Sequence, residues 1–167
     1  MSASAAIVQG RTAVYPERAP FHPEVRDPEA WFPETGPERN AVYEAVRRCF
    51  QRAGWDAPHS GTTAWNPLAA WIRPGRTVLL KPDLVKESHP RDPRGRRYAM
   101  THGSFSRAVL DYVVPALGGH GRVWLVDAPQ TDSSWDEIVR VLQLDRLVSF
   151  DAERGVDLEP IDLRQQE

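Results

Sequence analysis

The chain has 167 residues, of which 41% are hydrophobic and 26% charged, and this balance is typical of one globular domain rather than a disordered chain. The formal net charge of −2 provides no electrostatic basis for general binding to nucleic acids. The single cysteine, Cys49, excludes an intrachain disulfide and any iron–sulfur cluster held by several thiolates of this chain.

The first residues, MSASAAIVQG, lack the basic segment and the long apolar run of a secretory signal, and no stretch approaches the length of a membrane span. A lone cysteine also fits a reducing compartment. These features predict a soluble, cytoplasmic protein without a membrane partner.

The N-terminal part is expected to form a strand over residues 5–9 (AAIVQ) and an extended arm over residues 15–37. The arm contains six prolines, which exclude one continuous helix or a central strand. Its aromatic residues Phe21, Trp31 and Phe32 favour an arm that lies against the core, because a free linker is seldom so aromatic. We therefore assign residues 1–37 to a strand and an arm that pack on an α/β domain of residues 38–167.

A helix is predicted within residues 35–54, TGPERNAVYEAVRRCFQRAG. Thr35 and Glu38 have the spacing of a capping box, and Gly54 is suited to end the helix. One apolar stripe runs along it, formed by Val42, Val46, Cys49, Phe50 and Ala53. We interpret Cys49 in this stripe as a small core residue rather than a reactive thiol. A short helix, PLAAWI, is expected at residues 67–72.

The remaining chain alternates between strand and helix patterns. These patterns predict, in order, strand 77–82, helix 104–119, strand 122–127, helix 133–144 and strand 156–163. The alternation predicts an α/β fold, with a mostly parallel sheet and helices on its faces in Rossmann-like layers. The first two strands are expected to be parallel neighbours, because a helical crossover joins them. The domain is expected to be incomplete at its C-terminal end, with Ile161 and Leu163 left uncovered.

Charged side chains follow two of the predicted strands. Lys81 and Asp83 follow the apolar part of the first strand in the stretch VLLKPDLV, and Asp127 ends strand 122–127. Ligands of open α/β sheets bind beyond the carboxyl ends of the strands. The sequence leaves two interpretations open: Lys81 and Asp127 form a structural ion pair, or they face a common ligand.

The sequence THGS lies at the start of the helix that follows the first strand. Thr101, His102, Gly103 and Ser104 are placed to hold a phosphate or carboxylate, because a helix N-terminus offers unpaired N–H groups and partial positive charge. In the alternative interpretation, Thr101 or Ser104 only caps the helix and His102 lies in solvent.

Two loops add further candidates. In DAPQTDSS, residues 127–134, Thr131 and the two aspartates Asp127 and Asp132 offer oxygen ligands for a hydroxyl-rich molecule or a divalent cation. Spaced carboxylates alone do not specify a metal, and none is predicted. The sequence KESHPRDPRGRRYAM begins at Lys86 and carries five basic residues up to Arg97, so it is either a solvated loop or a cationic lid for an acidic ligand.

The three stretches VLLKPDLV, THGS and VWLVDAP together resemble a bacterial and archaeal family called domain of unknown function 362. In that family a strand ending in Lys-Pro-Asn is followed by Thr-His-Pro and by a strand that runs into Gly-Asp-Ser-Pro. The resemblance covers roughly residues 75–164. It matches this chain at Lys81, Pro82, Thr101, His102, Asp127 and Pro129, and the chain departs from it at Asp83, Gly103, Val126 and Ala128.

The resemblance implies that Lys81, His102 and Asp127 share one polar cluster. It also implies a fragment or a truncated member, because members of the family tend to be longer than this chain. Some members carry a ferredoxin-like cluster segment, for which this chain lacks the cysteines. The chain has the acidic Asp83 where the family usually has asparagine, and this departure adds a negative charge to the implied site.

Two hypotheses about function follow. In the first, the protein binds an anionic metabolite, phosphorylated or carboxylated, and is an enzyme or the ligand-binding half of an enzyme. In this hypothesis Lys81 neutralises the anion, residues 102–104 bind it, and His102 or Asp127 moves a proton. In the second, the protein is a non-catalytic module that docks a partner protein through the arm and the basic loop. The first hypothesis requires that Lys81, His102 and Asp127 converge on an open pocket. The second predicts that these three side chains are dispersed or sealed, with an exposed apolar patch elsewhere.

Overall fold

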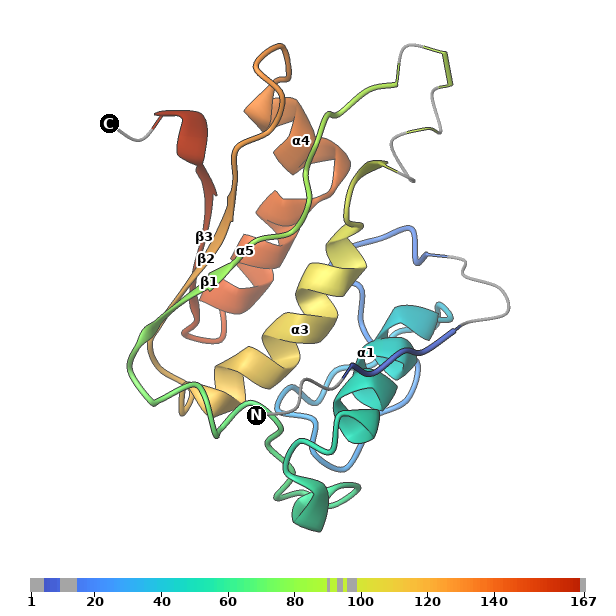
Figure 1. Cartoon of the computed structure of the whole chain (residues 1–167), viewed down its shortest axis with the longest axis vertical. Coiled ribbons are helices and arrows are strands. Elements are labelled where there is room, and N and C mark those ends of the chain that lie inside the picture. The colour runs from blue at the N-terminus through green and yellow to red at the C-terminus, as the bar shows by residue number, and fades with distance from the viewer. Residues whose placement is uncertain (1–4, 10–14, 90, 93–94, 96–98, 166–167) are drawn as a thin grey trace.

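The computed structural model describes residues 5–9, 15–89, 91–92, 95 and 99–165 (Figure 1). Its regular elements are α1 (Ala41–Arg52), β1 (Thr77–Leu80), α3 (Gly103–Ala116), β2 (Arg122–Asp127), α4 (Trp135–Val141), α5 (Leu144–Ala152) and β3 (Asp157–Asp162), with short 3₁₀ turns η1 (Ala57–His59) and η2 (Leu163–Gln165).

The three strands form one parallel sheet in the order β1-β2-β3. Val78 pairs in register with Val123, and Leu80 with Leu125, so β1 and β2 are the parallel neighbours that the sequence predicts. The α/β class and the final strand are confirmed as well. All three strands point the same way, and the side chains that follow Leu80, Asp127 and Asp162 therefore meet at one edge of the sheet.

The helices α3, α4 and α5 lie on one face of this sheet (Figure 1). Their apolar side chains enclose the inward residues of the strands in one core. The opposite face, which we call the outer sheet face, carries Leu79, Trp124, Val126 and Ile161, and Leu79 is 59% exposed. In the part of the chain that the structure describes, helices cover one face of the sheet, whereas the sequence predicts helices on both.

Helix α1 begins at Ala41 and not at the predicted capping box. Asn40 precedes it, and the Asn40 amide donates hydrogen bonds to the carbonyl oxygens of Phe21 and His22, at 2.9 and 3.2 Å, instead of capping the helix. Glu38 accepts a hydrogen bond from the backbone N–H of Glu17 at 2.8 Å. Contacts with the N-terminal segment therefore override the local capping signal.

Three further predictions of secondary structure are wrong. Residues 5–9 form no strand, and residues 67–72 form turns rather than a helix. The helix predicted over residues 133–144 breaks at Gln143, which has a positive φ of 55°, and a second helix, α5, follows. The Gln143 side chain accepts from the Ala19 N–H at 3.0 Å and donates to the Glu17 carbonyl at 2.8 Å, so this break also depends on the N-terminal segment.

Helix α3 begins at Gly103, with His102 as its N-cap. The His102 Nδ1 atom accepts a hydrogen bond from the Ser104 N–H at 3.3 Å, so neither Thr101 nor Ser104 has the predicted capping role. A Cβ atom at Gly103 would lie 2.5 Å from the Leu142 carbonyl oxygen and 2.8 Å from the Phe21 ring. Glycine is therefore required here for close packing of the helix start against its neighbours.

Candidate functional site

Lys81 and Asp127 meet at the carboxyl edge of the sheet. The Lys81 ammonium lies 2.7 Å from Oδ1 of Asp127. The lysine side chain is 61% exposed, whereas the aspartate side chain is only 5% exposed. Asp127 also accepts the backbone N–H of Leu84 at 2.6 Å and that of Ala128 at 2.8 Å. A buried, fully hydrogen-bonded carboxylate thus holds an exposed cation in a fixed place.

The charge states of this pair follow from its contacts. Burial alone would raise the pKa of Asp127, but the hydrogen bond from Lys81 and those from the Leu84 and Ala128 N–H groups together lower it. The hydrogen bond to Asp127 raises the pKa of Lys81, and the negative charges of Asp127 and Asp83 add to this. The pair is therefore an ammonium and a carboxylate at neutral pH.

The loops after the three strands are tied to one another. The Gln130 N–H donates to the Val85 carbonyl at 3.0 Å, and Lys86 forms an ion pair with Asp132. Arg164, just after β3, donates to the Gln130 carbonyl at 2.7 Å. The backbone contact between Gln130 and Val85 and the contact of Arg164 hold the surroundings of Lys81 in one arrangement. Of the other basic residues of the predicted loop, Arg91 is exposed, and Arg94, Arg96 and Arg97 lie outside the described residues.

A pocket of about 280 Å³ lies beside Lys81, between β1 and the first turns of α3. Its lining residues are Leu80, Lys81, Pro82, Thr101, Phe105, Ser106, Val109 and Leu125. Two hydrogen bonds to the backbone of Asp83 hold Thr101 at this pocket. The Thr101 N–H donates to the Asp83 carbonyl at 2.8 Å, and the Thr101 hydroxyl oxygen accepts the Asp83 N–H at 3.0 Å. Asp83 and Thr131 have exposed side chains.

His102 lines a different hollow, of about 330 Å³, together with Tyr15, Glu17 and Gln143. Its ring is stacked on Tyr15 at a centroid distance of 4.6 Å, and its Nδ1 lies 2.9 Å from the Ser104 hydroxyl. Gly103 and Ser104 are buried in the packing of the helix start. The structure thus brings Lys81, Asp127 and Thr101 together and places His102 on the other side of the first turn of α3.

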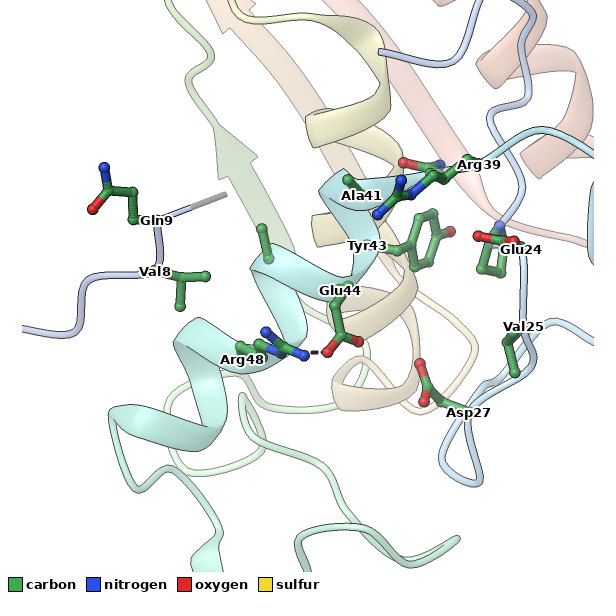
Figure 2. A pocket seen from close by; sticks show the side chains of 13 residues that line it. Val8, Gln9, Glu24, Val25, Asp27, Arg39, Ala41, Tyr43, Glu44 and Arg48 are labelled. Carbon is green, nitrogen blue, oxygen red and sulfur yellow. Dashed lines mark ion pairs between the residues drawn. The ribbon is translucent and has the colours of Figure 1, made fainter. Parts of the chain in front are cut away.

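A third hollow, of about 690 Å³, lies between α1 and the N-terminal segments (Figure 2). Charges of both signs line it. Glu44 and Arg48 form an ion pair on α1. Asp27 pairs at 3.1 Å with Arg47, which is not one of the lining residues. Acidic and basic side chains thus line this hollow together, in contrast to the pocket beside Lys81, whose lining residues include a single charged side chain.

Sequence reasoning missed a buried ionic cluster beneath the N-terminal arm. Arg107 is fully buried on α3, with Nε 2.7 Å from Asp111 and 3.1 Å from the Tyr43 hydroxyl. Its guanidinium lies 4.0 Å from the ring centroid of Phe150. The available signal was the spacing of Arg107 and Asp111, which puts opposite charges one turn apart on the inner side of an otherwise apolar helix.

Within the described residues, no group of three or more His, Cys, Asp or Glu side chains is arranged to hold a metal ion. No helix in that part of the chain has the length and apolar character needed to cross a membrane. Comparisons with known protein families, with curated proteins and with solved structures found no match.

Proposed function

We propose that the protein binds an anionic small molecule, carboxylated or phosphorylated, at the carboxyl edge of its sheet, with Lys81 as the cation that holds it. The observation that carries this proposal is the asymmetry of the Lys81–Asp127 pair, in which the carboxylate is buried and the ammonium stays exposed beside a pocket. A cation that is held in place by a buried carboxylate and stays open to solvent beside a pocket is placed to bind an anion.

The roles of the neighbouring residues follow from their contacts. Asp127 is the positioning residue, because its oxygens receive Lys81 and two backbone N–H groups and its lowered pKa keeps it ionised. Thr101 is the second polar side chain at the pocket. Proton transfer by His102 would require a ligand that reaches around the helix start, so binding is better supported than catalysis.

Replacement of Lys81 by methionine should weaken binding of the anion at least tenfold, because Lys81 is the one cation among the described residues that line this pocket. A thermal-shift screen of carboxylated and phosphorylated metabolites identifies ligands for this test, because any ligand of the native state raises the melting temperature of the protein. Lys86→Met is the matched control: it removes the same charge from the same edge of the sheet, where Lys86 pairs with the exposed Asp132. Full affinity in Lys81→Met, together with a lowered melting temperature, would assign Lys81 a structural role only.

A second candidate function, a docking module for a partner protein, is favoured by the outer sheet face. Parallel sheets are ordinarily covered on both faces. Here Leu79 is 59% and Leu163 39% exposed, and both line a shallow hollow of about 500 Å³ with Trp124, Val126 and Ile161. An exposed apolar surface of this kind is typical of an interaction site.

If the outer sheet face docks protein surfaces, the chain should associate reversibly with itself as its concentration rises, and Leu79→Lys should suppress this association. Sedimentation velocity over a concentration series measures both. The control is Thr77→Lys, which adds the same charge two residues earlier on the same side of β1, at the polar end of the face. A wild-type protein that stays monomeric throughout, or an equal effect of both variants, would remove the support for this second function.

A further inference from the structure

The pocket beside Lys81 has apolar walls and a polar rim. Five of its eight lining residues are apolar and come from β1, β2, α3 and the loop after β1; they are Leu80, Pro82, Phe105, Val109 and Leu125. Leu125 is completely buried, so the floor of the pocket is the hydrophobic core itself. A ligand that entered this space would meet mainly hydrocarbon.

The polar side chains of the pocket are Lys81, Thr101 and Ser106. The Thr101 oxygen already accepts a hydrogen bond from the Asp83 N–H, so its own hydrogen is available to donate to an anion. Lys81 is the only charged residue among the eight. A head group with one negative charge matches this set of donors.

Two carboxylates limit the anionic charge that the site accepts. Asp127 is in contact with Lys81, and Asp83 is near enough to raise the pKa of Lys81. A dianion such as a phosphate monoester would meet repulsion from both. A sugar would also place hydroxyl groups against walls that offer them no hydrogen-bond partner, which costs free energy.

We propose that the ligand of this site is an amphiphilic monocarboxylate, whose carboxylate binds Lys81 and Thr101 and whose apolar body fills the space between Leu80, Phe105 and Val109. This inference rests on the proposed function and narrows its ligand class. The pocket volume of about 280 Å³ is close to twice the ~150 Å³ of a cavity that binds benzene. Its capacity therefore suits a medium alkyl chain or a fused pair of aromatic rings.

A series of straight-chain carboxylates from acetate to octanoate tests this inference by calorimetry, with naphthoate as the aromatic member and inorganic phosphate as the hydrophilic anion. Affinity should rise about fourfold for each added CH₂ group that is buried and then level off when the pocket is filled. Octanol, which has the same body without the charge, should bind at least tenfold more weakly than octanoate. Comparison of octanoate with naphthoate shows whether alkyl or aryl bodies fit better.

Two variants locate the binding. Lys81→Met should weaken every carboxylate at least tenfold, with Lys86→Met as the unaffected control. Val109→Thr keeps the shape of the side chain and adds a hydroxyl to the wall, so it should reduce the gain in affinity per CH₂ group. Urea unfolding of both variants verifies that they are folded.

The outcomes separate this inference from the proposed function. If phosphate or short hydrophilic carboxylates bind in a Lys81-dependent way without any gain from chain length, the proposed function stands and the amphiphilic ligand class is overturned. If octanoate binds equally to wild type, Lys81→Met and Val109→Thr, it binds elsewhere, and the ligand class is again overturned. If no anion depends on Lys81, both proposals fall.

Discussion

Replacement of Arg107 by methionine should lower the free energy of unfolding by about 3–5 kcal/mol, the cost typical of removing one partner of a buried ion pair. Arg107 is fully buried, and its loss would leave the carboxylate of Asp111 uncompensated inside the protein. The variant would also lose the hydrogen bond to the Tyr43 hydroxyl and the contact with the face of Phe150.

Urea unfolding followed by circular dichroism measures this effect. Arg140→Met is the matched control, because Arg140 pairs with Glu137 on α4 but is exposed to solvent. Exposed pairs of this kind contribute roughly 0–1 kcal/mol. If Arg107→Met cost no more than Arg140→Met, the buried cluster would have no stabilising role. A double variant, Arg107→Met with Asp111→Leu, should recover part of the loss, because it removes the unpaired carboxylate as well.

The stability of the protein should fall between about pH 4 and pH 7 through one residue, Asp151. Burial raises the pKa of this carboxyl group from 3.8 to about 7; the charges of Arg107 and Arg154 oppose the rise, and that of Asp111 adds to it. Neither oxygen has a hydrogen-bond partner among the described residues. As pH rises above 4, the unfolded chain loses the proton while the folded protein keeps it, so ionisation favours unfolding by up to about 4 kcal/mol at pH 7.

Asp151→Asn should remove this contribution. The measurement is the free energy of unfolding of both proteins at several pH values from 4 to 7. As pH rises, the free energy of unfolding of the asparagine variant should increase steadily relative to that of the wild type. Comparing the two proteins isolates Asp151, because the other carboxyl groups are common to both. Asp127, for example, has a lowered pKa, and its contribution to stability is lost as pH falls. A difference that stays constant with pH would contradict a raised pKa at Asp151.

The parts of the fold that the sequence predicts correctly depend on local patterns. Short apolar strands joined by a helix predict the parallel pair β1 and β2, and charges at the ends of these strands predict that Lys81 and Asp127 lie close together. The sequence leaves open whether that pair is structural or holds a ligand, because the exposure of Lys81 and the pocket beside it, on which the proposal of a ligand rests, follow from no sequence pattern.

The parts that were missed depend on contacts between distant segments. The break at Gln143 is stabilised by residues 17 and 19, and the start of α1 by the bonds from Asn40 to the carbonyls of residues 21 and 22. Arg107 was assigned to a helix but not to a buried cluster, because Tyr43 and Phe150, which enclose it, come from two other helices. The spacing of Arg107 and Asp111 indicates an ion pair on one helix, but no local pattern identifies the residues of other segments that enclose it.

The pairing of Asp83 with Thr101, and the isolated antiparallel bridge between Leu84 and Met100, join the two ends of the segment between them. Because the segment is closed at its base in this way, its length has little effect on the free energy of folding. Doubling the length of a loop costs only about 0.6 kcal/mol. Insertions, deletions or a grafted peptide between residues 88 and 98, past the contacts of Val85 and Lys86, would leave Lys81 and Thr101 in place. The protein therefore carries a position at which new recognition elements can be added next to the pocket, by evolution or by design, without rebuilding the scaffold.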